Sequence, residues 1–245
     1  MTQAVALPSH RDEDFRYADL DALAGIWPVA REEIRIAAGE SGALAIVLDG
    51  AEATARHLHI EIADGASFDL RVLNTGSGFA RIAVDAKLGA KSEFTLGAAQ
   101  LGGGKANLEL VTEVAHLSAD SISRQVVRSV LGGEAVGTYL GKVAVARGAD
   151  GTDAEQSVRA MLLDRTATAN ARPELEIFAD DVKCAHGCAV GELDANALFY
   201  MAQRGLPPET AKRLMLQAFV AEAFVGAADE EALDAASQAA LEALL

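Results

Sequence analysis

The feature that most constrains the fold is a series of short alternating apolar runs between residues 44 and 178. Alternation of apolar and polar residues with a period of two is typical of β-strands that bury one face. Clusters rich in glycine, serine and asparagine separate the runs, and such clusters mark turns. The strands expected from this pattern are 44–48, 57–62, 67–72, 80–84, 93–96 and 107–111.

A short phrase recurs among these runs at a spacing in the mid-twenties. Glycine, alanine, serine and phenylalanine recur in this order at 65–68 and at 89–94, and a weaker echo follows at 119–122. Repeats of this length, with several short strands each, are typical of stacked β-coils. A β-sandwich also has short strands at regular spacing, so the periodicity alone leaves both folds open.

The chain divides into three regions by pattern. Residues 1–40 are polar and are expected to form an irregular N-terminal arm, with a possible short helix at 17–23. Residues 41–190 carry the strand signal and are expected to form the β core. Residues 191–245 are expected to form a C-terminal helical subdomain, because their apolar residues recur at helical spacing.

Three helices are expected in that subdomain. Asp194 is suited to cap a helix that stops at Gly205, a second helix begins at Pro208, and a third starts near Asp229. The apolar stripes of these helices are typical of packing onto the parent domain, and a partner could use them instead.

Both cysteines of the chain lie in one segment, in which Cys184, His186 and Cys188 fall within five residues. The surrounding residues favour a strand, in which Cys184 and His186 point to the same face with Cβ atoms roughly 7 Å apart. A thiolate and an imidazole at this separation can bind one metal ion or two adjacent metals of a cluster.

Plainer interpretations of the segment stay open. A lone cysteine is usually a small buried hydrophobe, and a lone histidine is usually a hydrogen-bonded polar group. Two ligands do not complete a structural zinc site, so any metal would need further ligands from elsewhere. Cys184 and Cys188 would lie roughly 13 Å apart if extended, which is too far for a disulfide unless the chain bends at Gly187.

Other candidate groups carry weaker signals. His57 and His59 share a strand face, and we expect a solvent-facing polar pair rather than metal ligands. His116 follows a strand and would face either the interior of a coil or a turn. The run at 102–105 lacks the spacing and the serine or threonine of a phosphate-binding loop, and the chain has no nucleophile elbow or dinucleotide fingerprint.

The segment from 173 to 207 resembles the C-terminal signature of the SufB/SufD family, in its SufD branch. The shared blocks are P-x-L-E-I, then D-D-V-K-C-x-H-G, then G-x-L-D, then L-F-Y-x-x-x-R-G, in order and at matching spacing. The stretch 137–163 also resembles the family pattern, so the resemblance covers roughly residues 108–225. The family consists of scaffold proteins for iron–sulfur cluster assembly, and the resemblance implies a right-handed parallel β-helix with a C-terminal helical subdomain.

The resemblance also implies partners and a site. It implies a SufB-like subunit, a SufC-like ATPase docked on the C-terminal helices, and a transient iron–sulfur cluster or iron shared with the partner at Cys184 and His186. Cys188 stands where the family usually has alanine and is a possible third ligand. The chain is short for the family and is expected to lack its usual N-terminal helical region, so a homodimer through an open strand edge is also possible. Involvement of a flavin stays undecided.

We expect the ATPase-binding surface at residues 194–225, centred on Phe199, Tyr200 and Arg204. Tyr200 and Arg204 lie four residues apart on one helix face, and tyrosine and arginine are enriched at interface hot spots. The alternative is that Phe199 and Tyr200 fasten the helix to the β core.

Composition excludes several other functions. The net charge of −15 disfavours nucleic acids and anionic membrane surfaces as partners. No apolar run is long enough to span a membrane, and the N-terminus lacks the pattern of a secretory signal. Two cysteines beside a histidine suit a reducing cytoplasm.

The sequence therefore predicts a non-enzymatic scaffold subunit. A purely structural β-helix subunit without a metal role is the first alternative. A β-helix enzyme is less well supported, because the adjacent Asp180 and Asp181 would face opposite sides of a strand.

Overall fold

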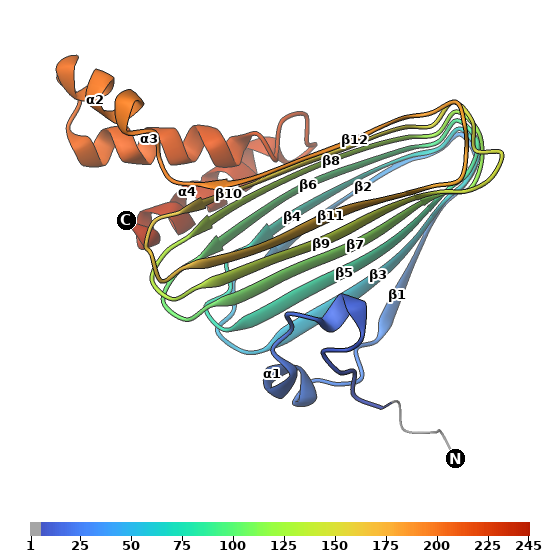
Figure 1. Ribbon diagram of the computed structural model, residues 1–245, viewed down its shortest axis with the longest axis horizontal. Helices are drawn as coiled ribbons and strands as arrows, with labels where there is room; N and C mark the ends of the chain where they lie inside the picture. The colour runs from blue at the N-terminus through green and yellow to red at the C-terminus, as the bar shows by residue number, and fades with distance from the viewer. Residues whose placement is uncertain (1–5) are drawn as a thin grey trace.

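Twelve strands and five helical segments are present in residues 6–245, the part of the chain that the computed structural model describes. The strands form two six-stranded parallel sheets that face each other across one interior (Figure 1). The first sheet contains β1 (Arg31–Ile36), β3 (Thr54–Ile62), β5 (Phe79–Leu88), β7 (Asn107–His116), β9 (Val136–Val145) and β11 (Thr168–Ile177). The second contains β2 (Ser41–Leu48), β4 (Ser67–Asn74), β6 (Glu93–Gly102), β8 (Ile122–Leu131), β10 (Asp153–Leu162) and β12 (Lys183–Gly191).

Successive strands alternate between the two sheets, so the chain winds as a parallel β-helix with two strands in each coil. The expected β-helix core and C-terminal helices are confirmed, and each expected strand lies within one of β2 to β7. Arg35 and Glu61 on adjacent coils are 26 residues apart, whereas Thr138 and Asn170 are 32 residues apart. The mid-twenties spacing therefore holds for the first coils, and later coils are longer.

Alternate residues of each strand fill the interior. Leu70, Ile82 and Leu96 are among the fully buried side chains that face inward. Burial of each such side chain stabilises the fold by about 1.5–3 kcal/mol relative to leaving it exposed. The alternation that predicted strands thus also assigns one face of each strand to the core.

Turns on one side of the β-helix stack in register. Gly39, Gly65, Lys91, Asp120 and Gly151 all have positive φ, and each donates its N–H to a carbonyl of the next coil. Glycine adopts this conformation without steric cost, which suits Gly39, Gly65 and Gly151. Gly89, in the second copy of the recurring phrase, does not have positive φ, and a Cβ atom there would instead collide with Asp64.

Polar side chains gather inside the later coils. The Tyr139 hydroxyl lies within hydrogen-bonding distance of Thr112, Gln125 and Gln156, and burial raises the pKa of Tyr139 to about 12. His116 faces the interior, not a solvent-exposed turn, with Ser121 and Ser123 within 2.7 and 2.9 Å of its ring nitrogens.

The C-terminal region contains α2 (Ala195–Gln203), α3 (Pro208–Ala221) and α4 (Glu230–Leu244), as the sequence predicts. The Asp194 side chain accepts a hydrogen bond from the Asn196 N–H and caps α2. Helices α3 and α4 pack on the outer face of the second sheet, where the apolar contacts include Leu216 and Phe224 against Leu101 and Val130. Arg71 and Arg128 add polar contacts, because Arg71 donates to the Ala223 carbonyl and Arg128 pairs with Glu222.

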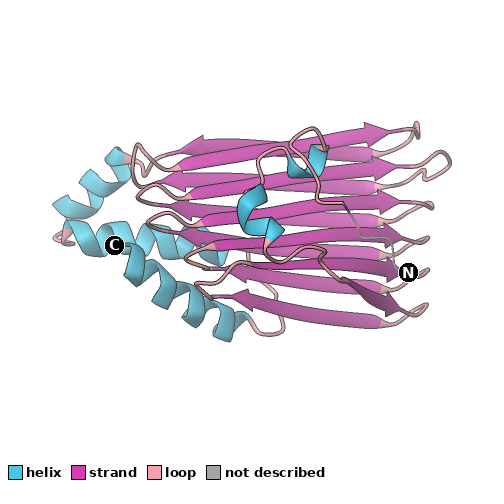
Figure 2. Ribbon diagram, turned by 90° about the horizontal axis from the view of Figure 1, so that it is seen from below, coloured by secondary structure: helices cyan, strands magenta, loops and turns pink. Residues whose placement is uncertain are grey.

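The N-terminal segment covers the outer face of the other sheet (Figure 2). It contains η1 (Glu13–Phe15) and α1 (Leu20–Ala24), which lies close to the helix expected at 17–23. The expectation of an irregular arm through residue 40 needs a correction, because β1 pairs with β3 from Arg31 onward. The expectation about a secretory signal rests partly on residues 1–5, which lie outside the described residues.

Candidate functional site

The β-helix ends in two edge strands, β11 and β12. Strand β11 pairs with β9, and β12 pairs with β10, while no further strand of residues 6–245 lies on their other sides. Edge strands present unpaired N–H and C=O groups that can pair with another chain. We call this part of the molecule the open end.

Cys184, His186 and Cys188 lie on β12 and share one face. They are opposite the buried, inward-facing Ala154, Gln156 and Val158 of β10, so that face continues the interior surface of the coils. Cys184 packs partly against the core, whereas His186 and Cys188 are exposed because no coil covers them. The structure therefore places the three expected ligands side by side at the open end.

The chemistry of Cys184 depends on its surroundings. Desolvation by burial raises the pKa of the Cys184 thiol, and a hydrogen bond with the Ala154 backbone partly opposes this change. The thiol is therefore protonated at neutral pH, and a metal would have to displace the proton. Both cysteines are free, and the strand continues through Gly187 without a bend, as expected if they form no disulfide.

The ligand set is incomplete within the chain. Residues 6–245 contain no group of three or more His, Cys, Asp or Glu side chains arranged to hold a metal ion. Asp180 and Asp181 lie in the turn before β12. Any metal at the open end would therefore need ligands beyond those that residues 6–245 supply.

Two large apolar side chains are exposed at the open end, and the sequence analysis did not identify them. Phe178 is 57% exposed in the turn after β11, and Val190 is 48% exposed on β12. Large exposed apolar side chains that cluster are typical of interaction surfaces. Val190 shares the inward register of β12 with Cys184, His186 and Cys188, which could have identified it, whereas Phe178 lies in the turn after β11 and follows no strand register.

The candidate partner-binding residues lie on α2, which projects beyond the sheets (Figure 1). Phe199 and Tyr200 are 65% and 57% exposed, so they do not fasten the helix to the β core. Arg204 lies over the Tyr200 ring, 4.8 Å from its centroid, and donates a hydrogen bond to the Tyr200 hydroxyl. The three residues therefore form an exposed aromatic and basic surface.

The remaining histidines lie away from the open end. His57 and His59 face outward from β3, but the expectation of a solvent-facing pair is wrong for His59, which is only 3% exposed. The Asp85 carboxylate lies 2.8 Å from His57 Nε2. The fold thus supplies a carboxylate partner that is 28 residues away in the sequence. Gly104, in the glycine run after β6, has positive φ and belongs to a turn between coils.

Comparison with known proteins identifies a family and several similar relatives. Residues 44–219 match the model of the family described as SUF system FeS cluster assembly, SufBD core domain. The chain is 43% identical to protein ABCI7, chloroplastic, of Arabidopsis thaliana over 41% of its length, and 34% identical to the iron–sulfur cluster assembly protein SufD of Escherichia coli over 44%. It is 31% identical to the Bacillus subtilis protein of the same name over 49% of its length.

These matches cover 21%, 26% and 28% of the three relatives, so the aligned part of the chain spans about a quarter of their length. Within residues 6–245, none of the helices has the length and apolar character needed to cross a membrane.

Proposed function

We propose that this chain, which belongs to the SufBD core family of the SUF iron–sulfur cluster assembly system, acts as a scaffold subunit rather than as an enzyme. In this proposal it helps to hold iron or a nascent cluster at the interface with a SufB-like subunit, and it docks a SufC-like ATPase. The iron and sulfide are cargo that the complex assembles and passes on. Two cysteines that remain thiols suit a reducing compartment such as the cytoplasm.

One observation carries the proposal: Cys184 and His186 share a face on an exposed edge strand. Thiolate is a preferred ligand for iron–sulfur clusters, and imidazole also binds iron. A partner strand that pairs with β12 would bring its own side chains beside them, because paired strands lie about 4.8 Å apart. The missing ligands would then come from the partner, and Cys188 is a possible third ligand from this chain.

The same edge supports a purely structural role as the second candidate. The unpaired edge strands together with the exposed Phe178 and Val190 suit strand pairing with a SufB-like subunit or with a second copy of this chain. This role requires no metal, so removal of the ligands distinguishes the two functions.

We expect the Cys184→Ser and His186→Ala variants, produced together with the partner subunits, to form the complex but to hold at least tenfold less iron and sulfide. The reason is that each substitution removes one of few available ligands while leaving the strand edge intact. Metal and sulfide analysis of the purified complex measures the effect. His57→Ala is the matched control, because His57 lies outside the open end. Wild-type iron content in both ligand variants would favour the structural role.

We expect Arg204→Glu to abolish co-purification of the ATPase while leaving the thermal midpoint within about 1 °C of wild type, since surface changes usually alter stability little. The substitution reverses a charge and removes the arginine from the Tyr200 ring. Lys105→Glu is the matched control, because it makes the same charge change at a side chain that is 84% exposed and lies in the turn after β6, outside the C-terminal helices. Retention of the ATPase at wild-type yield by Arg204→Glu, or its loss together with a lower midpoint, would contradict the assignment of this surface to ATPase binding.

A further inference from the structure

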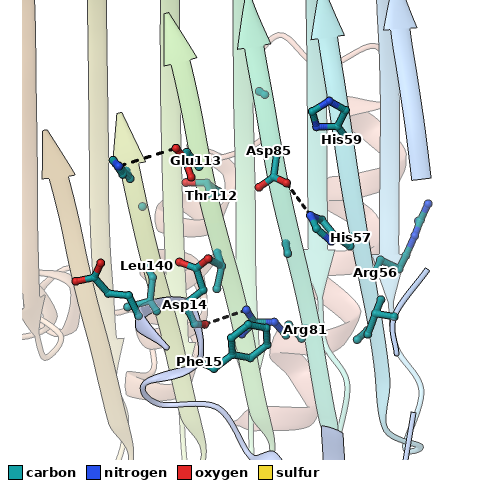
Figure 3. A pocket seen from close by; sticks show the side chains of 18 of the residues that line it. Asp14, Phe15, Arg56, His57, His59, Arg81, Asp85, Thr112, Glu113 and Leu140 are labelled. Carbon is teal, nitrogen blue, oxygen red and sulfur yellow. Dashed lines mark hydrogen bonds and ion pairs between the residues drawn. The ribbon is translucent and has the colours of Figure 1, made fainter. Parts of the chain in front are cut away.

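A cavity of about 520 Å³ lies between the outer face of the first sheet and the N-terminal segment (Figure 3). Pockets of this size commonly hold small molecules when they combine apolar walls with a few polar groups. The cavity lies apart from β12 and α2, and of the open end only Arg172 and Glu174 of β11 line it, so an inference about it does not depend on the proposed scaffold function.

The register of the strands creates its floor. Ala83, Val111 and Leu140 lie opposite one another on β5, β7 and β9 and line the cavity as a flat apolar shelf. The next outward row along the same strands places Asp85, Glu113 and Lys142 side by side. A ligand on the shelf would therefore have apolar contact below it and charged groups along one side.

The N-terminal wall is held in place by specific contacts. Phe15 and Trp27 pack edge to face with ring centroids 6.0 Å apart. The Arg81 guanidinium lies 4.3 Å from the centroid of the Phe15 ring and donates to the Asp14 carbonyl at 2.9 Å. Glu13 forms an ion pair with Arg172 at 3.1 Å. The cavity is thus preformed, with an aromatic wall facing the apolar shelf.

The arginines that line the cavity are already neutralised. Arg56 pairs with Glu32, and the buried Arg81 pairs with Glu109. Arg172 has carboxylate partners in both Glu13 and Glu174. Lys87, at the solvent-exposed edge of the cavity, has no such partner within residues 6–245. The arginines therefore offer little unbalanced positive charge to a ligand on the shelf, whereas Lys87, unpaired among the described residues, is a cation at the edge of the cavity.

The carboxylates that line the cavity are less well balanced. Asp14 has no basic group within ion-pairing distance in the described part of the chain, and Glu113 has only Lys142 at 3.9 Å. Hydrogen bonding to His57 lowers the pKa of Asp85, which keeps that carboxylate ionised. Unbalanced negative charge beside an aromatic wall favours a cation, both by Coulomb attraction and by cation–π contact.

We propose that this cavity binds a small organic cation with an amine or amidine group on a flat apolar body. The body lies on the shelf of Ala83, Val111 and Leu140, and the charged group points toward Glu113 and Asp14. The net charge of −15 adds a long-range attraction for such a ligand.

Benzamidine, benzamide and benzoate test the proposal, because they share a planar ring and differ in charge. Titration of the ¹⁵N-labelled full chain, followed by amide chemical shifts, should show benzamidine binding at the shelf residues. Benzamide should bind at least about threefold more weakly, and benzoate should not bind measurably. Equal or tighter binding of benzoate, or shifts confined to other parts of the molecule, would overturn the proposal.

Three variants and one control sharpen the test. Glu113→Gln and Asp14→Asn should each weaken benzamidine binding about threefold by removing one charge, and Ala83→Phe should abolish binding by filling the shelf. Glu93→Gln, an equivalent change at an exposed position of the second sheet, should have no effect. Unchanged binding by Glu113→Gln and Asp14→Asn would refute the charge-based site even if Ala83→Phe failed to fold.

Discussion

Replacing Gly97 with valine is expected to detach the C-terminal helices and to lower the free energy of unfolding by about 3 kcal/mol. Gly97 lies on the outer face of β6, directly beneath the end of α3. A Cβ atom at this position would overlap the Ala223 carbonyl oxygen and crowd the Arg71 guanidinium that binds the same carbonyl. Because the carbonyl belongs to the backbone, it cannot move without displacing the helix.

Chemical denaturation and limited proteolysis of the α3–α4 connection measure this effect. Gly187→Val is the matched control, since Gly187 lies in the same cross-strand row and a Cβ there has no neighbour within 4 Å. We expect the control to change stability by less than about 0.5 kcal/mol. Equal stability of both variants would mean that α3 tolerates displacement from the sheet.

Acidification is expected to destabilise the protein through His116. Burial lowers the pKa of His116 from 6.5 to about 4, so between these pH values the unfolded chain binds a proton that the folded chain excludes. The contribution of His116 to stability is fully present above pH 6.5 and is lost as the pH falls toward 4. The loss amounts to about 3 kcal/mol, from about 1.4 kcal/mol for each pKa unit.

Free energies of unfolding at several pH values between 7 and 4 test this expectation. Carboxylates also bind protons as the pH approaches 4, so wild type alone does not isolate the effect of His116. The informative quantity is the difference between wild type and His116→Gln in the slope of the free energy of unfolding against pH. The variant should show a shallower slope than wild type. Parallel slopes for wild type and His116→Gln would show that His116 takes up its proton in the folded state.

Much of the fold could be predicted because inward-facing apolar residues alternate strictly along most strands. No individual strand was predicted at β1 or at β8 to β10. Strand β1 lacks a clear pattern, since its six residues include four charged side chains and only Ile34 and Ile36 face the core. Within 168–191 the sequence predicted a strand around Cys184 and His186 but not the full lengths of β11 and β12, which have ten and nine residues. Strand ends depend on pairing with the adjacent coil, which a local pattern does not encode.

The candidate site was predictable in part for the same reason. That Cys184 and His186 share a face follows from the period of a strand. Whether another coil packs on this face depends on the number of coils and on the path of the chain after the last one, and neither can be read from the local pattern. The cavity was beyond a local analysis, because residues such as Ala83 and Val111 are 28 positions apart and become neighbours only through the coil register.

The coil that carries Cys184 and His186 has a neighbour on one side only. In a stack of coils, each coil is stabilised mainly by contacts with its nearest neighbours. A terminal coil therefore opens more readily and exchanges its amide protons faster than an interior one. A protein that covered the open end would give this coil its second neighbour. Rigidity at the thiol and the imidazole would then be a property of the assembled complex and would be lost when it separates.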